Sequence, residues 1–204
     1  MAKNIQCELI SWSETERLCL QLAKQIKSSG FQPDIVIAIG RGGYVPARLI
    51  CDYLDIMALT SIKIELYGVG SGKNDQAVIK FPLCHNIRDM KVLLVDDVND
   101  SGETLELAVK HLNTFQPRAI KIAVIHHKTS SHFQLDFFAK KIIKWRWLIY
   151  PWAVYEDISG FLSQQIPPAE NLQQAQQYLD EQYNIRISKK RLRQVMDLMA
   201  DSGC

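Results

Sequence analysis

The 204-residue sequence predicts an α/β fold in which a mainly parallel β-sheet is flanked by helices. Short apolar runs that fit buried strands alternate along the chain with segments whose apolar residues recur at helical spacing. Two of these runs, residues 35–39 and 92–95, lead into glycine-bearing turns that open helices. This alternation is typical of parallel sheets, in which a helix connects each strand to the next.

The first helix is predicted to begin at Ser13, which forms a capping-box pattern with Glu16, and to end at Gly30. Its apolar face consists of Leu18, Leu22 and Ile26. The strand at residues 35–39 is apolar throughout, as expected for a strand buried on both faces.

A second helix follows this strand, with Pro46 in its first turn, where proline is tolerated. Its apolar positions at spacing four are Val45, Leu49 and Tyr53. Residues 57–65 form the next predicted strand. Residues 67–80 are polar and carry three glycines, so they are predicted to be a mobile hood loop that closes over a ligand.

After the central strand at 92–95, a third helix has an apolar face made of Leu105, Ala108, Val109 and Leu112. Residues 119–125 supply another strand, and an aromatic block at 145–152 follows it. From residue 167 the chain becomes glutamine-rich and helical. We therefore predict a main domain at residues 1–166 and a C-terminal helical extension at 167–204.

The extension shows two apolar stripes, the first made of Leu172, Ala175 and Leu179 and the second of Leu192, Val195, Met196 and Met199. Ser188 is the predicted cap of the second helix. A basic run beside that stripe, Lys189, Lys190, Arg191 and Arg193, could contact RNA, but such a run is more often a solvated helix face. We expect no nucleic-acid partner.

The overall composition gives no sign of a membrane or of an acidic partner. The formal net charge is only +2, and the apolar runs are too short to span a bilayer. No apolar signal segment follows the first residues, and the five cysteines show no Cys-x-x-Cys spacing. We expect a cytoplasmic protein with free thiols. His126 and His127 are adjacent on a predicted strand and should point to opposite faces.

The most informative segment is residues 93–104, Leu-Leu-Val-Asp-Asp-Val-Asn-Asp-Ser-Gly-Glu-Thr. An apolar strand delivers Asp96 and Asp97 to its carboxyl end, where open α/β sheets bind ligands. Adjacent carboxylates can accept hydrogen bonds from sugar hydroxyls and bind a divalent cation. The backbone N–H groups of residues 101–104, at a helix N-terminus, suit a phosphate. The segment therefore indicates a phosphorylated ribose.

This segment resembles the signature of type I phosphoribosyltransferases, in which two acids and an aliphatic residue precede a phosphate loop. The matching residues are Asp96, Asp97, Val98, Asn99, Asp100, Ser101, Gly102, Glu103 and Thr104. The resemblance implies that Asp96 and Asp97 bind the ribose of phosphoribosyl pyrophosphate (PRPP), with Asp97 as a ligand of Mg²⁺. Residues 99–104 would hold the 5′-phosphate, and Asp100 would be the catalytic acid or base. Glu103 is unusual in such a loop, and we expect it to point to solvent.

A second glycine-bearing turn at residues 40–46, Gly-Arg-Gly-Gly-Tyr-Val-Pro, resembles the Ser-Arg-Gly-Gly-x-x-Pro turn of bacterial xanthine-guanine phosphoribosyltransferases. The resemblance implies that Gly40, Arg41 and Gly42 bind pyrophosphate, with a cis non-proline peptide as one way to shape the turn. Gly40 stands where that family has serine.

Two further matches concern the base. Lys128, at the end of a strand, resembles the lysine that donates to the 6-oxo group of a purine, and lysine supplies only donors. Residues 147–152, Trp-Leu-Ile-Tyr-Pro-Trp, resemble a Trp-Ile-x-x-Pro-Trp segment. By that resemblance Trp147 stacks on the purine and the backbone of Leu148 reads its edge.

Together these matches imply a Mg²⁺-dependent transferase that joins PRPP and a 6-oxopurine base, acting as a homodimer or homotetramer. The aspartate that often follows the Pro-Trp pair is Ala153 here, with Glu156 and Asp157 slightly later, so the choice among hypoxanthine, guanine and xanthine stays open. Two alternatives remain. One is a PRPP-sensing regulator that binds nucleic acid, and the other is a phosphoribosyltransferase for a non-purine acceptor.

Overall fold

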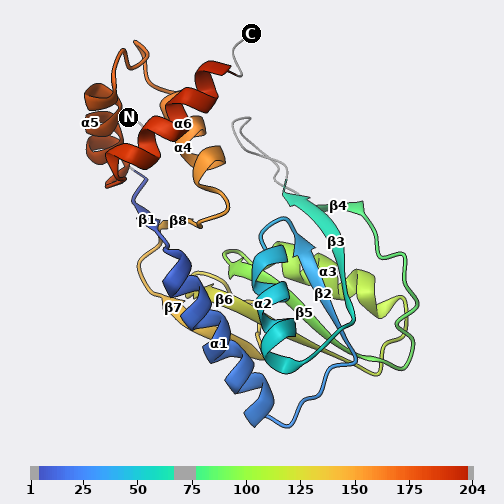
Figure 1. Ribbon diagram of the computed structural model, residues 1–204. Helices are drawn as coiled ribbons and strands as arrows, with labels where there is room; N and C mark the ends of the chain where they lie inside the picture. Colours follow the sequence, from blue (N-terminus) through green and yellow to red (C-terminus); the bar gives the residue numbers. More distant parts are fainter. Residues whose placement is uncertain (1–4, 67–76, 202–204) are drawn as a thin grey trace. The chain divides into compact units, whose positions relative to one another are not determined.

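The computed structural model describes residues 5–66 and 77–201. Its contacts divide the chain into two compact units (Figure 1). The sheet unit is Thr15–Lys144, and the terminal unit combines Met1–Glu14 with Trp145–Cys204. In chain order the elements are β1 (Cys7–Leu9), α1 (Trp12–Ser28), β2 (Ile35–Gly40), α2 (Tyr44–Leu54), β3 (Leu59–Leu66), β4 (Ala77–Phe81), β5 (Lys91–Asn99), α3 (Glu103–Asn113), β6 (Ala119–Lys128), β7 (Phe137–Ile142), β8 (Trp147–Ile149), α4 (Val154–Leu162), α5 (Leu172–Tyr183) and α6 (Lys189–Asp201).

The sheet unit is built on six strands in the order β4-β3-β2-β5-β6-β7. All neighbours are parallel except β3 and β4, which pair antiparallel. The predicted α/β class with a mainly parallel sheet is therefore confirmed. The strand order reverses direction between β2 and β5, which places the topological switch point there.

Helices cover both faces of this sheet, with α1 and α2 on one face and α3 on the other (Figure 1). Every residue of β2 is buried, as its apolar sequence predicted. Alternate residues of β2 and β5, including Ile37 and Leu94, pack with Leu105 and Leu112 of α3 in one core cluster. Because strand side chains alternate between faces, the intervening residues are buried on the opposite side.

The start of the first helix was predicted slightly wrongly. Helix α1 begins at Trp12, and the hydroxyl of Ser11 accepts the backbone N–H of Glu14 at 3.1 Å. Ser13 lies inside the helix instead of capping it. Ser11 and Glu14 have the same capping-box spacing as Ser13 and Glu16, so the local pattern allows a helix start at either serine.

The apolar face of α2 also differs from the prediction. Its buried residues are Pro46, Ala47, Ile50 and Cys51, whereas the predicted face of Val45, Leu49 and Tyr53 is only half-buried. The helix has apolar residues on adjacent stripes, so spacing alone could not decide which of them faces the sheet.

The predicted hood loop at residues 67–80 needs a correction at its end. Residues 77–80 belong to strand β4, which pairs with β3, and residues 67–76 lie outside the described residues. Alternation in β4 is weak because it is an edge strand with exposed side chains such as Phe81.

The terminal unit has its own small core. Strand β1 pairs in parallel with β8, and α4, α5 and α6 pack together around residues such as Ile158, Leu179 and Leu192. Asn171 caps α5, and Ser188 caps α6 as predicted, accepting the N–H of Arg191 at 3.3 Å. The division at residues 166 and 167 stays a prediction. Cys7, Cys19, Cys51 and Cys84 are free thiols, as expected.

Candidate functional site

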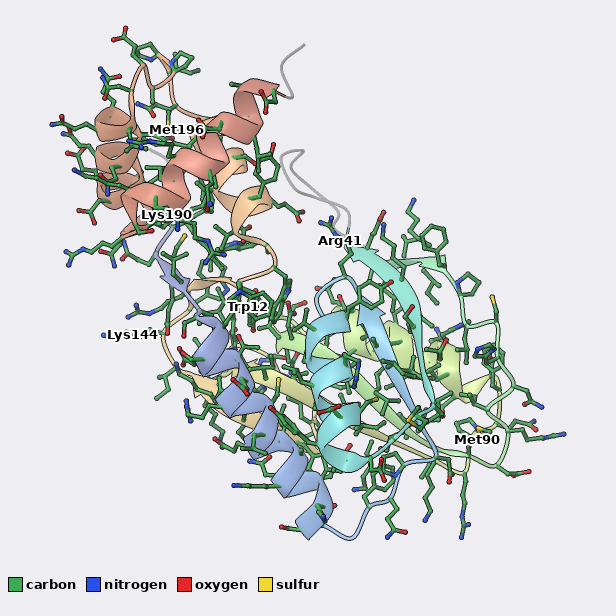
Figure 2. The ribbon with its side chains drawn as sticks, viewed as in Figure 1. Trp12, Arg41, Met90, Lys144, Lys190 and Met196 are labelled. Atoms are coloured by element: carbon green, nitrogen blue, oxygen red, sulfur yellow. The ribbon has the colours of Figure 1, made fainter. Side chains whose placement is uncertain are left out.

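Two turns meet at the switch point of the sheet unit. The first follows β2 and carries Arg41, which is exposed at the end of that strand (Figure 2). The peptide between Gly40 and Arg41 is cis. The second follows β5. A Cβ atom added at Gly42 would lie 2.5 Å from Cγ and 2.6 Å from Oδ1 of Asp97. The predicted pyrophosphate turn and the predicted ribose acids are therefore in direct contact.

The two acids occupy different environments on β5. Asp96 is only 8% exposed, whereas Asp97 is half-buried at the switch point. The backbone N–H of Asp97 donates to Oδ1 of Asp96 at 2.9 Å. Burial, and next the charge of Asp97, raise the pKa of Asp96 well above its usual range. Such a pair favours ligands that bring hydroxyl donors or a cation.

The loop after Asn99 has the form expected for a phosphate cradle. Gly102 adopts a left-handed φ of 99°, and an added Cβ there would lie 2.6 Å from Cβ of Phe133. No side chain caps helix α3 at Gly102, so its first turn retains N–H groups that can meet an anion. Ser101 and Glu103 are both exposed, which agrees with a Glu103 that points to solvent.

Asn99 is 1% exposed and its amide is held from two sides. The hydroxyl of Ser131 donates to Oδ1 at 3.1 Å, and Nδ2 lies 3.1 Å from Nδ1 of His127. Burial lowers the pKa of His127, which keeps the ring neutral. The side chain of Asn99 thus fixes the start of the loop.

Lys128 and Asp100 form an ion pair across the end of the sheet. The Nζ of Lys128 lies 2.5 Å from Oδ2 of Asp100. The lysine side chain is 3% exposed and the aspartate 43%. A buried cationic donor beside a more exposed carboxylate acceptor forms a compact polar pair. The sequence placed these two residues in separate roles, and the structure brings them together.

The predicted base-stacking segment lies in the terminal unit. The backbone N–H of Trp147 donates to Gln6 O at 2.9 Å, and Ile149 O accepts from the N–H of Ile10 at 2.9 Å. Backbone groups alternate sides along a strand, so the N–H and C=O of Leu148 point away from β1. This orientation suits the edge-reading role expected of Leu148.

The indole of Trp147 is 37% exposed, and its Nε1–H donates to Oδ1 of Asp157 on α4 at 3.0 Å. Burial raises the pKa of Asp157 to about 6, and the Trp147 hydrogen bond opposes that rise. Sequence reasoning gave Asp157 and Ser131 no role. Asp157 had a weak signal, as an acid five residues after Trp152, and Ser131 had none.

The donor set at the switch point fits Mg²⁺. Within residues 5–66 and 77–201, no group of three or more His, Cys, Asp or Glu residues could hold a metal alone. Mg²⁺ is often bound by one or two carboxylates together with substrate phosphates and water. Asp96 and Asp97 offer such oxygens beside a turn suited to phosphate. Across the same described ranges, no helix has the length and apolarity needed to cross a membrane.

Comparison with protein families matches residues 7–157 to the phosphoribosyl transferase domain. Xanthine-guanine phosphoribosyltransferase from Ruegeria sp. is 35% identical over 153 residues, covering 70% of this chain and 83% of that protein.

Solved structures agree with this match. Purine phosphoribosyltransferase from Pyrococcus horikoshii is 28% identical, with a TM-score of 0.62, covering 72% of this chain and 93% of that one. Xanthine-guanine-hypoxanthine phosphoribosyltransferase from Helicobacter pylori is 25% identical, with a TM-score of 0.62, covering 78% of this chain and 100% of that one.

Proposed function

The chain belongs to the phosphoribosyl transferase family, and from this membership we propose that it transfers phosphoribosyl from PRPP to a 6-oxopurine. The products are a purine nucleoside monophosphate and pyrophosphate, so the enzyme serves purine salvage. A bond forms between a purine nitrogen and the anomeric carbon as the bond from that carbon to pyrophosphate breaks. Positive charge develops on the sugar, and positioning and charge stabilisation supply the catalysis.

The observation that carries this proposal is the Lys128–Asp100 pair. On a 6-oxopurine the O6 acceptor lies beside N7, which carries a proton in one tautomer. A lysine donor and a carboxylate acceptor 2.5 Å apart present the complementary pattern. We assign Lys128 to O6 and Asp100 to the N7 proton, where it acts as general base.

The remaining roles are those that membership of the family implies. Asp96 and Asp97 bind the ribose hydroxyls, and Asp97 is the protein ligand of Mg²⁺, which supplies positive charge to the pyrophosphate. Gly40, Arg41 and Gly42 hold the pyrophosphate. Residues 99–104 hold the 5′-phosphate. Trp147 stacks on the purine and the backbone of Leu148 meets its edge.

The test is a competition assay with hypoxanthine, guanine, xanthine and adenine at fixed Mg²⁺ and PRPP. The 6-amino group of adenine would place a donor against Lys128, leaving buried donors unsatisfied at a cost of about 1 to 3 kcal/mol or more. We expect the three oxopurines to react and adenine to be rejected. A preference for adenine would remove Lys128 from the base site.

The same assay separates the alternatives. A non-purine acceptor would leave all four bases unreactive while PRPP still binds. A nucleic-acid-binding regulator would use the basic α6, but Arg191 there already donates to Pro151 O at 3.0 Å. A cytoplasmic location, a homodimer or homotetramer and the absence of a nucleic-acid partner stay predictions.

A further inference from the structure

We propose that Asp157 is a positioning residue of the base site, whose carboxylate holds the indole of Trp147 in the orientation that stacks on the purine. The proposal rests on the proposed function and adds a residue to it. Asp157 lies on α4, ten positions beyond Trp147. Asp157 does not touch the base and acts through the tryptophan.

Hydrogen bonds hold Trp147 at its backbone and at its indole nitrogen. Its backbone is fixed to β1 through the 2.9 Å hydrogen bond to Gln6 O. Its Nε1–H is fixed to α4 through the 3.0 Å hydrogen bond to Asp157. With both ends held, rotation of the ring about its side-chain bonds is restricted, while 37% of the residue stays exposed. Preorganising an aromatic ring in this way lowers the ordering cost of stacking.

A carboxylate at this place needs a reason, because burial opposes its charge. Burial raises the pKa of Asp157 to about 6, and the neighbouring Glu156 adds to the rise. Burial, and next the charge of Asp157, raise the pKa of Cys7 on β1. On α6, Arg191 donates to Pro151 O at 3.0 Å, and its charge is not among the causes that shift the pKa of Asp157. A neutral amide could accept the indole N–H without this penalty. The presence of a carboxylate therefore indicates that its charge serves the hydrogen bond to Trp147.

The ionised acceptor gives the stronger hydrogen bond, since bonds to charged groups exceed neutral ones. As pH falls through about 6, Asp157 gains a proton and the hydrogen bond that it accepts from Trp147 weakens. The structure therefore links purine affinity to pH through a group that touches neither substrate.

The first measurement follows the Trp147 indole directly. In full-length protein labelled with ¹⁵N-tryptophan, the Trp147→Phe variant identifies the Trp147 Nε1–H signal. We expect that signal to shift with pH around a midpoint near 6 and to stay flat in Asp157→Asn. A signal unaffected by both pH and Asp157→Ala would overturn the proposal. This measurement needs no turnover, so it stands even if no 6-oxopurine reacts.

The second measurement compares Michaelis constants. Asp157→Ala should raise the KM for hypoxanthine about tenfold and leave the KM for PRPP unchanged. Asp157→Asn should give a smaller rise that no longer varies with pH. A comparison variant is Glu156→Gln, an exposed neighbour on the same helix, which should leave the KM for hypoxanthine near the wild-type value well above pH 6 and move the midpoint of its pH dependence slightly downward.

A double-variant cycle separates positioning from general destabilisation. In the Trp147→Phe background the ring can stack but cannot donate, so adding Asp157→Ala should produce no further rise in KM. An additive rise, or equal rises for both substrates, would refute the positioning role while leaving the transferase assignment intact. Absence of turnover with every oxopurine would instead refute the proposed function.

Discussion

At the scale of single residues, the pyrophosphate turn shows how one side chain constrains another. Gly40 occupies the position of the serine in the Ser-Arg-Gly-Gly-x-x-Pro turn that this segment resembles. A Cβ atom at Gly40 would lie 2.6 Å from the hydroxyl of Tyr44 and 2.8 Å from its Cζ. That hydroxyl also accepts from Ser61 Oγ at 3.4 Å. The tyrosine occupies the space that a serine side chain would need, so the two positions depend on each other.

Gly42 should tolerate a methyl group less well than Gly40. In Gly42→Ala the new carbon would overlap the carboxylate of Asp97, and relieving such overpacking costs about 1 to 3 kcal/mol. We expect kcat/KM for PRPP to fall about tenfold to hundredfold. In Gly40→Ala the contact is the mobile end of Tyr44, and the loss should be only a few-fold. Steady-state kinetics with both variants decides this, and equal losses would contradict it.

Asp97→Asn should lower turnover sharply while the fold survives. The amide has nearly the volume of the carboxylate but lacks the charge that supports Mg²⁺ and PRPP. One oxyanion-type contact of this kind is worth about tenfold to a thousandfold in rate. The measurement is kcat at saturating Mg²⁺ and PRPP, with the thermal midpoint as the control. Wild-type turnover would count against the assigned role.

At the scale of elements, the loop between β5 and α3 depends on a neighbour from another connection. Ser131, after β6, donates to Asn99 at the base of the loop, and its hydroxyl also accepts the N–H of Phe133 at 3.2 Å. Gly102 packs against the same segment. The proposed phosphate loop is therefore shaped by a turn about thirty residues further along the chain, since 32 positions separate Asn99 and Ser131.

Ser131→Ala should destabilise the protein and weaken PRPP binding together. The change leaves the buried Oδ1 of Asn99 without this donor, at a cost of about 1 to 3 kcal/mol. Ser130→Ala is the matched control, because Ser130 is the exposed neighbour. Thermal unfolding and the KM for PRPP should change in the first variant alone. A silent Ser131→Ala would show that the loop holds its shape unaided.

The elements that sequence predicted are those with strong periodicity or a capped start. Residues 35–39 and 92–95 are buried runs, and their strands were found because burial on both faces leaves only apolar residues. Strands β1, β4, β7 and β8 were not predicted. They are short or lie at sheet edges, where one side meets solvent and the apolar pattern is diluted.

In the candidate site, too, some residues could be predicted from the sequence and others could not. Asp96, Asp97 and Lys128 could be proposed from the sequence because local motifs indicate their roles. Ser131 and Asp157 could not, because each acts through a contact made only by the folded chain. Distances such as 2.5 Å between Lys128 and Asp100 likewise arise from parallel strands that are far apart in sequence. Local sequence motifs indicate which residue types form the candidate site, whereas tertiary packing determines how their side chains are oriented.

At the scale of the whole molecule, Asp157 should make stability depend on pH. Its folded-state pKa, about 6, is raised above the ordinary value of 3.8. The stability that its protonated form contributes is therefore fully present below about pH 4 and is lost as pH rises through about 6. At neutral pH the buried charge costs about 1 to 2 kcal/mol after allowance for solvent screening.

Asp157→Asn removes that charge and keeps an oxygen for the indole. We expect its thermal midpoint to exceed that of the wild type near neutral pH and to approach it near pH 4. Thermal unfolding across this range provides the measurement. A variant less stable than the wild type at neutral pH would show that the carboxylate strengthens the fold, contrary to this account.

The pairing of β1 with β8 has a consequence for the order in which the molecule is completed. Cys7 is synthesised near the start of the chain, yet its strand partner Trp147 follows 140 positions later. Throughout that interval the ribosome releases every strand of the six-stranded sheet, which can fold on contacts of shorter range. During that time strand β1 lacks β8, the strand with which it pairs. The ring proposed to recognise the base is thus fixed only after the loops proposed to bind the phosphates have formed, so a nascent chain would complete its sugar-phosphate site before its purine site.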